Sequence, residues 1–273
     1  MKVWVGEGLW DENEARVSPF DHALITGDGV FETLKVTGGR PFAVRRHLER
    51  LARSAAGLGL PVPDGGTLRR ALEAVVGGNG LGEGVVRLTL TGGPSPLSSE
   101  RGRAGPTLIV AAAVRPDWPP TASVAVAPWP RNERGAVAGL KTVSYAENVV
   151  ALSWAHDRGA DEAVFANLEG RLCEGTATNV FVGHDGRLVT PPLSSGCLAG
   201  VTRQLLLELG VAAEEDLSVT ALVGADEALL TSSTRDIQPI ASVDGKPIPA
   251  APGALTKAAM DAFADICEGN DDP

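Results

Sequence analysis

The sequence has few cysteines and no long apolar run, and these absences exclude several classes of protein. Its three cysteines, Cys173, Cys197 and Cys267, are odd in number, widely spaced and without a CxxC pair, so neither a disulfide framework nor a metal site is indicated. The longest apolar stretch, residues 108–114, is far too short to span a bilayer, and the first residues lack the apolar run of a signal peptide. We therefore expect a cytoplasmic protein with no membrane partner.

Lysine is also scarce, and the overall charge is negative. Only five lysines stand against nineteen arginines, so a lysine in apolar surroundings calls for a chemical explanation. The net charge of -10 and the pI near 4.9 disfavour nucleic-acid and anionic-membrane partners, because binding to phosphates requires clustered Lys and Arg. With 273 residues, 44% of them hydrophobic, the chain is long enough to bury a sizeable core.

The signatures of several common enzyme classes are absent too. Gly27-Asp28-Gly29 has no third glycine at the GxGxxG spacing, and the sequence contains no Walker A lysine, no GxSxG and no HExxH. The four histidines are scattered along the chain, and a lone histidine is more often structural than catalytic. Nucleotide-binding and common hydrolase functions therefore lose support.

Strand and helix patterns alternate irregularly along the chain and predict an α+β fold in two lobes. The periodicity predicts helices over residues 44–58, 67–76, 145–158 and 202–209, and strands over residues 2–5, 30–36, 85–91, 107–114, 123–127, 162–166, 179–182, 187–190 and 227–230. Strict βαβ alternation is missing, which disfavours a doubly wound sheet. The proline-rich segment RPDWPPT indicates a boundary. It separates a small N-terminal lobe, residues 1–116, and a linker, residues 117–121, from a larger C-terminal lobe, residues 122–273.

Two charged residues in segments of small and apolar residues are candidates for chemistry. Lys141 lies in AGLKTV just before a predicted helix, where desolvation disfavours the ammonium form and favours an amine that attacks an aldehyde. Glu174 lies in CEGTATNVF, a turn that leads into an apolar strand, and a carboxylate held beside a pyridine nitrogen keeps that nitrogen protonated. A lysine that extends its amine to solvent and a surface glutamate before a turn would give the same patterns.

Two further segments have the chemistry of anion-binding turns. Gly200-Val201-Thr202 opens a predicted helix, whose free backbone N–H groups and dipole favour a phosphate. Thr231-Ser232-Ser233-Thr234 follows a strand and offers several hydroxyl and amide groups to the same kind of ligand. Helix capping and turn formation explain each segment equally well, so neither identifies a site by itself.

The order of the motifs is more specific than any one of them. The segments GDGVFET, HLERL, GLKTVSYAENV, CEGTATNVF, GVTR and TSSTRDIQPI follow one another over nearly the whole chain. Together they resemble the fold-type-IV pyridoxal-phosphate enzymes, a family that comprises branched-chain aminotransferases, D-amino-acid aminotransferases and aminodeoxychorismate lyases. The resemblance implies a two-lobed α+β fold that holds pyridoxal 5′-phosphate between its lobes. It also implies a homodimer in which loops of the partner complete the substrate pocket.

Carried onto this sequence, the resemblance assigns a role to each matching residue. Lys141 would form the Schiff base with the cofactor and move the proton during the reaction. Glu174 would pair with the pyridine nitrogen, and Tyr145 would lie near the phenolic oxygen. Arg50, in the HLERL motif, would bind the phosphate. Its partners in that role would be the backbone and hydroxyl groups of Val201, Thr202, Ser232 and Ser233.

The residues expected around the substrate depart from each branch of the family. Phe31 stands where D-amino-acid aminotransferases often have a tyrosine, and the loop TGGPSP lacks their arginine-histidine pair. Gly92 and Ser144 stand where aminodeoxychorismate lyases tend to carry an arginine and an asparagine. Arg87 resembles the strand arginine of branched-chain aminotransferases and would bind a substrate carboxylate together with the Thr234 backbone. An ion-paired strand arginine would have the same pattern.

These observations favour a transaminase with D-amino acids as the leading donors and 2-oxoglutarate or pyruvate as acceptors, working by a ping-pong mechanism. Aminodeoxychorismate lyase, which forms 4-aminobenzoate and pyruvate, is the alternative, because the general character of the sequence is similar to bacterial chains assigned to that lyase. A branched-chain L-amino-acid aminotransferase is a third, less favoured interpretation of the same motifs. A non-catalytic pyridoxal-phosphate carrier would not need both Lys141 and Glu174, and their joint presence argues against it.

Overall fold

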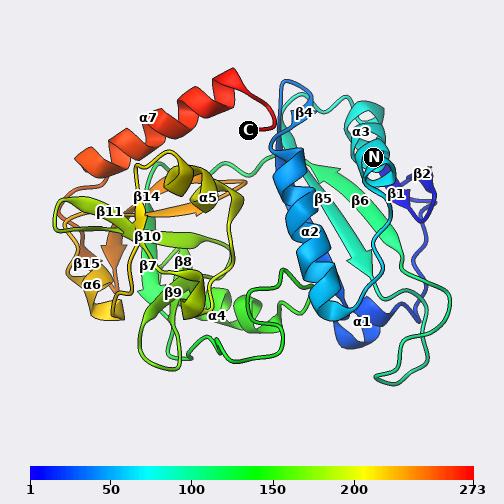
Figure 1. The fold of residues 1–273 in the computed structure, drawn as a ribbon, viewed down its shortest axis with the longest axis horizontal. Helices are drawn as coiled ribbons and strands as arrows, with labels where there is room; N and C mark the ends of the chain where they lie inside the picture. Colours follow the sequence, from blue (N-terminus) through cyan, green and yellow to red (C-terminus); the bar gives the residue numbers. More distant parts are fainter. The chain divides into compact units, whose positions relative to one another are not determined.

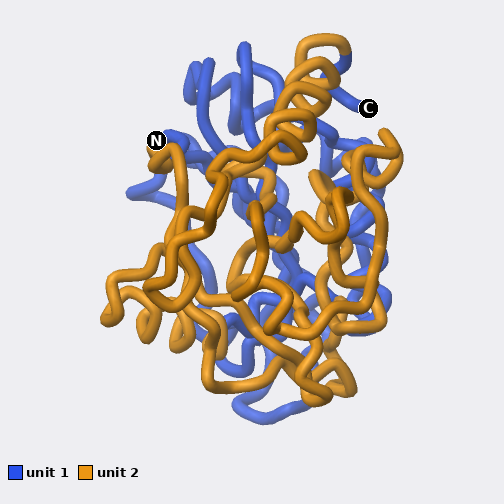
Figure 2. The backbone as a smooth tube through the Cα atoms, turned by 90° about the vertical axis from the view of Figure 1, so that its left-hand side faces the viewer, with its two compact units in different colours: residues 1–116, 140–145, 270–273 blue, residues 117–139, 146–269 orange.

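The chain divides into two units in the computed structural model, which describes residues 1–273. Unit 1 consists of residues 1–116, 140–145 and 270–273, and unit 2 consists of residues 117–139 and 146–269. Figure 2 colours unit 1 blue and unit 2 orange. The segment that carries Lys141 thus belongs to unit 1, whereas the division expected from the sequence placed this lysine in the C-terminal lobe. The difference arises because residues 141–143 hydrogen-bond to a strand of unit 1, a long-range contact that no local pattern predicts.

Unit 1 is an antiparallel sheet with two helices packed against one of its faces (Figure 1). The strands lie in the order β2-β1-β6-β5-β3-β4. The strands are β1 (Lys2–Val5), β2 (Gly8–Asp11), β3 (Gly29–Thr37), β4 (Arg40–Pro41), β5 (Gly84–Thr91) and β6 (Leu108–Ala113). The helices are α1 (His22–Thr26), α2 (Val44–Leu58) and α3 (Gly65–Gly78). Leu34, Leu51, Leu72 and Leu88 from four of these elements meet in one buried cluster, which forms the core of the unit.

Helix α2 illustrates how the sequence pattern produces this packing. His47, Leu51 and Ala55 recur at spacings of four residues, so they lie on one face of the helix, and all three are buried. Arg50 is buried on the same side. The helix ends before Gly59, which adopts a left-handed conformation with φ of 66° that favours glycine. The helix thereby buries two polar side chains, His47 and Arg50, against the sheet.

Unit 2 is built on a nine-stranded mixed sheet (Figure 1). Its main path has the order β12-β11-β10-β13-β14-β7-β8-β9, and β15 pairs with β14. The strands are β7 (Ala122–Val126), β8 (Glu162–Ala166), β9 (Leu172–Gly175), β10 (Asn179–His184), β11 (Arg187–Thr190), β12 (Ala213–Glu214), β13 (Ala228–Ser232), β14 (Asp236–Val243) and β15 (Lys246–Pro247). The helices are α4 (Ala146–His156), the 3-10 helix η1 (Leu193–Ser195), α5 (Val201–Glu208), α6 (Val219–Val223) and α7 (Ala254–Gly269). Helix α4 packs against β8 and helix α5 against β13.

The structure confirms the predicted α+β class, and each predicted helix and strand is present with its ends shifted by at most two residues. Sequence patterns missed several elements, of which α7 and β14 are the longest. Strand β14 contains Pro239, and a proline within an apolar run argues against a strand because it lacks the N–H donor; in the structure Pro239 pairs with Leu229 of β13. None of the helices has both the length and the apolar character that crossing a membrane requires.

Candidate active site

The backbone around Lys141 is held along the edge of β3 that lies opposite β5. The Phe31 N–H donates to the Lys141 carbonyl at 3.1 Å, and the Val143 N–H donates to the Gly29 carbonyl at 2.9 Å. The Lys141 N–H donates to the Ser54 hydroxyl of α2 at 3.1 Å. A Cβ atom at Gly29 would lie 3.2 Å from Val143 Cγ2 and 2.9 Å from a carbonyl oxygen of β5, so glycine permits this close approach. The lysine is thus attached to both the sheet and helix α2 of unit 1.

Three of the residues predicted for the reaction meet at the ring of Phe31. Lys141 Nζ lies 4.3 Å from the ring centroid, and the guanidinium carbon of Arg87 lies 3.6 Å from it. The Tyr145 ring packs edge-on against the same ring, with the two centroids 5.3 Å apart. Phe31 itself is only 4% exposed. One aromatic ring therefore brings an amine, a guanidinium and a phenol together, and its π-face attracts both cations.

Arg50 is held by a buried carboxylate that the sequence analysis did not identify. Arg50 Nε and Nη2 donate to the two oxygens of Glu32 at 2.8 and 2.7 Å, and His47 Nδ1 lies 2.6 Å from Glu32 Oε2. Glu32 comes from β3, and all three side chains are buried. The two parallel hydrogen bonds fix the plane of the guanidinium. A sequence signal did exist: a lone acidic residue within the apolar strand VFETLKV needs a buried partner.

The charge of Arg50 decides the ionisation of this cluster. Burial alone would raise the pKa of Glu32, but the positive charge and hydrogen bonds of Arg50 outweigh burial and lower that pKa to about 2. Burial lowers the pKa of His47, against the opposing effect of Glu32, and the positive charges of Arg50 and Lys141 lower it further. The cluster at neutral pH is therefore an ion pair beside a neutral imidazole, with the Lys141 amine close enough to influence it.

We expect this ion pair to make the stability of the protein fall in acid. The pKa of Glu32 is about 2 in the folded protein against an ordinary value of 4.5, so between these values the unfolded chain binds the extra proton. The stabilisation is complete above pH 4.5 and is lost as the pH falls through 2, a contribution of about 3 kcal/mol. Urea unfolding above pH 4.5 and near pH 2 measures it. The loss should be smaller in Glu32→Gln, and an equal loss in both proteins would contradict the expectation.

In unit 2, Glu174 lies in β9 with both of its carboxylate oxygens facing nitrogen atoms. The Leu198 N–H donates to Glu174 Oε2 at 2.9 Å, and Arg131 Nε lies 3.5 Å from Glu174 Oε1. In the sheet Glu174 is the partner of Phe165 in β8. Its side chain is only 14% exposed. Glu174 is therefore a largely buried, oriented carboxylate and not the solvated glutamate that its turn-like sequence would also allow.

The two anion-binding turns predicted in unit 2 meet around Asn179. A Cβ atom at Gly200 would lie 1.9 Å from Asn179 Oδ1, so the start of α5 packs directly on this side chain. In the sheet Asn179 pairs with Thr231, the first residue of the TSST segment. Gly200 caps α5 without a side-chain hydrogen bond, and the first-turn amides of a helix, here including Val201 and Thr202, can then bind an anion.

The Ser232 side chain forms contacts within the TSST turn. Its hydroxyl accepts a hydrogen bond from the Arg235 N–H at 3.1 Å and lies 3.3 Å from Thr234 Oγ1. This pattern closes the turn through its own side chains. The Ser232 hydroxyl, which the sequence analysis assigned to a phosphate, thus helps to shape the turn that presents Ser233.

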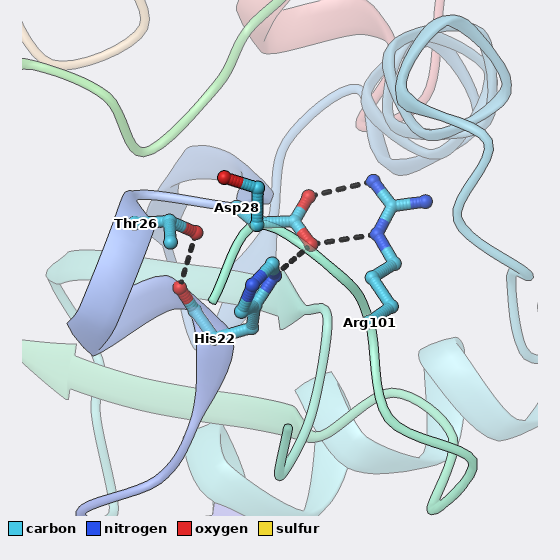
Figure 3. Close-up of a pocket in the computed structure, with 5 residues that line it drawn as sticks. His22, Thr26, Asp28 and Arg101 are labelled. Carbon is cyan, nitrogen blue, oxygen red and sulfur yellow. Dashed lines mark hydrogen bonds and ion pairs between the residues drawn. The ribbon is translucent and has the colours of Figure 1, made fainter. Parts of the chain in front are cut away.

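Arg101, the first cation in the loop after β5, is bound by an acidic partner within unit 1 (Figure 3). Arg101 Nε and Nη2 donate to the two oxygens of Asp28, each at 2.6 Å. His22 Nδ1 lies 2.7 Å from Asp28 Oδ2 and its Nε2 lies 3.0 Å from the Ser98 carbonyl; these two hydrogen bonds raise the pKa of His22. A cavity of about 400 Å³ is lined by His22, Thr26, Asp28, Ser99 and Arg101. The charge of Arg101 is thus balanced by Asp28 and anchors the loop.

Known proteins are similar to this chain over most of its length. Residues 29–243 match the model of the family described as amino-transferase class IV. A putative branched-chain-amino-acid aminotransferase from Methanocaldococcus jannaschii is 32% identical, over 97% of this chain and 96% of that protein. A D-alanine aminotransferase from Listeria innocua is also 32% identical, over 90% of this chain and 88% of that protein. The PLP-bound structure of a hypothetical aminotransferase from Mycobacterium tuberculosis matches with a TM-score of 0.83 and 28% identity, over 97% of this chain and 99% of that one.

Proposed function

Since the chain belongs to the amino-transferase class IV family, we propose that it transfers amino groups from small D-amino acids to 2-oxo acids. Pyridoxal 5′-phosphate is its cofactor, as in the family. When bound, this cofactor supplies an electron sink that stabilises negative charge at the α-carbon of the amino acid. Pyruvate and 2-oxoglutarate are the proposed acceptors, and the two half-reactions follow one another in ping-pong order.

The residues within each unit fit the parts of this cofactor. In unit 1, Lys141 offers an amine for the covalent link to the aldehyde, and the oriented guanidinium of Arg50 matches a phosphate. In unit 2, Glu174 offers a carboxylate to the pyridine nitrogen. The start of α5, which lacks a side-chain cap, offers backbone N–H groups to the phosphate, and a Cβ atom at Gly200 would disrupt this segment. Each unit therefore holds residues whose chemistry suits one part of a phosphorylated pyridine aldehyde.

The contacts of Arg87 and Lys141 with the Phe31 ring are the observation that supports a small amino acid as the substrate. Both cationic groups lie within 4.3 Å of the same centroid, and the proposal is that a substrate whose carboxylate binds Arg87 places its α-carbon at the Lys141 amine. Lys141 would then remove the proton from that carbon and return it, because positioned acid–base groups act at short range. A small amino acid needs only this one carboxylate site.

The loop after β5 supports the transaminase over the lyase. Aminodeoxychorismate carries two carboxylates and would gain from a second cationic partner. Arg101, the first cation in that loop, is bound by both oxygens of Asp28. A second carboxylate would have to compete with this ion pair, which makes a dianionic substrate less favourable at this loop.

The similar proteins support different amino-group donors, so the chirality of the donor has to be measured. The relative from Listeria innocua, a D-alanine aminotransferase, supports a D-amino acid, and the relative from Methanocaldococcus jannaschii supports a branched-chain amino acid at the same identity. Exposed apolar side chains support a homodimer, which is the assembly we propose. Phe20, Leu24 and Leu97 are 51%, 72% and 75% exposed, and a second copy of the chain would remove such surface from water.

Arg87→Ala is expected to lower kcat/KM for the amino-acid half-reaction by about 10- to 150-fold, because it removes a charged hydrogen bond that contributes about 1.5–3 kcal/mol. The measurement is the conversion of the visible cofactor band to pyridoxamine phosphate by D-alanine, D-glutamate, L-alanine and L-leucine. Arg69→Ala, which removes an exposed arginine of α3, is the control. Conversion by L-leucine alone would identify a branched-chain enzyme. Pyruvate release from aminodeoxychorismate without conversion by any amino acid would identify the lyase.

A further inference from the structure

Arg131 is a largely buried cation beside Glu174, and the roles described above do not use it. Its Nη1 donates to Glu147 Oε2 at 2.7 Å and to Asn148 Oδ1 at 2.9 Å, both at the start of α4. Its guanidinium carbon lies 4.1 Å from the ring centroid of Phe165 in β8. These contacts from a helix and a strand fix the plane of the guanidinium. Its Nε edge faces Glu174 Oε1 across 3.5 Å.

The Nε–H group of Arg131 is a buried donor without a hydrogen-bond partner. Leaving a buried donor unpaired is unfavourable, so such groups in folded proteins have an explanation. Attraction between this edge of the guanidinium and the Glu174 carboxylate is the compensation that the geometry offers. The interaction between Arg131 Nε and Glu174 is therefore an electrostatic attraction between charged groups and not a hydrogen bond.

The charge of Arg131 does not cancel those of its two carboxylate partners. Arg131 lies between two carboxylates, Glu147 and Glu174, so the three together carry a charge of about -1. Two further titratable groups that interact with Glu174 are the thiols of Cys173 and Cys197. Burial raises the pKa of both thiols, and Glu174 raises them further, so they stay neutral.

Glu162 is the remaining carboxylate on the neighbouring strand β8, and it does not change this balance. It forms a buried ion pair with Arg235 at 3.1 Å and accepts a hydrogen bond from the Thr176 N–H at 3.1 Å. Its charge is therefore balanced locally. Within these contacts, Arg131 is the cation that faces the Glu174 carboxylate.

We propose that Arg131 is a positioning residue that keeps Glu174 ionised and oriented toward the ring nitrogen of the cofactor. The proposal rests on the role of Glu174 in the proposed function. A protonated Glu174 would lose its attraction for a positively charged ring nitrogen. Because a cation within about 4–6 Å favours the carboxylate form by about one to three pH units, Arg131 extends cofactor binding toward acid pH.

The test is the dissociation constant of pyridoxal 5′-phosphate as a function of pH, measured by equilibrium dialysis of the full-length protein. In the unaltered protein the affinity falls in acid where Glu174 takes up a proton. In Arg131→Met, which keeps the length of the side chain without its charge, this fall is expected about one pH unit higher. Arg131→Lys, which keeps the charge, should restore most of the original profile. Arg134→Met, which removes an exposed arginine bound to Glu133 and Glu169, should leave the profile in place.

Glu174→Gln separates a charge effect from a general structural effect. Adding Arg131→Met to Glu174→Gln should leave the pH profile unchanged, because the Glu174 carboxylate on which Arg131 is proposed to act is absent. An unshifted profile in Arg131→Met would overturn the proposal for Arg131 and leave the proposed function in place. The same shift in the Glu174→Gln background would have the same consequence. If Arg131→Met does not fold, Arg131→Gln provides the same comparison with an amide donor retained. Failure of the unaltered protein to bind pyridoxal 5′-phosphate at any pH would overturn the proposed function and this inference with it.

Discussion

Lys141→Ala is expected to lower the rate of transamination by about 10³- to 10⁴-fold and to abolish the covalent attachment of the cofactor. The lysine is proposed both to bind the aldehyde and to move the proton at the α-carbon, so its loss removes two contributions to the reaction. Its amine lies 4.3 Å from the Phe31 centroid and its backbone is attached to β3 and α2. A neighbouring lysine could not replace it without a large movement of the chain.

Borohydride reduction followed by mass spectrometry of peptides identifies the attached lysine. The label is expected on Lys141 in the unaltered protein and nowhere in Lys141→Ala. Lys246→Ala, which removes an exposed lysine of β15, is the control and should keep both the label and the activity. Lys35 is a buried lysine, with its amine 4.8 Å from the Phe42 ring. A label on Lys35 would refute the assignment of Lys141.

Arg50→Ala is expected to lower the free energy of unfolding by about 3–5 kcal/mol and also to weaken binding of pyridoxal 5′-phosphate. The first effect follows from the structure, because both oxygens of the buried Glu32 carboxylate accept hydrogen bonds from Arg50. Removing the guanidinium leaves that carboxylate buried without its cation. The second effect follows from the proposed contact between Arg50 and the phosphate. The sequence alone predicted only the second.

A second substitution separates these two effects of Arg50. In the double variant Glu32→Gln/Arg50→Ala no buried charge is left uncompensated, so urea unfolding should show that much of the stability returns. Cofactor affinity should stay low in the double variant if Arg50 binds the phosphate. Arg53→Ala removes an exposed arginine of the same helix and should change neither quantity. Recovery of both stability and affinity in the double variant would leave Arg50 with a structural role only.

Local patterns in the sequence determined the helices, the strands and the chemical character of the site residues. The spacing of apolar residues in VRRHLERLARSAAGL predicts α2 to the residue, because helix periodicity depends only on neighbours within one or two turns. Lys141 and Glu174 were recognisable because each is a charged group in a segment of small and apolar residues. The order of six motifs along the chain pointed to the family, and the family model matches residues 29–243.

The tertiary structure alone decided which of these residues act on one another. Lys141 joins unit 1 because its carbonyl accepts a hydrogen bond from Phe31, far away in the sequence. Glu32 holds Arg50, and Arg131 faces Glu174, through pairs whose members lie on different elements. Periodicity reports how a residue is placed on its own helix or strand, whereas an ion pair depends on where the chain brings a second element. The partners of the charged groups, and with them their ionisation, are therefore properties of the folded chain.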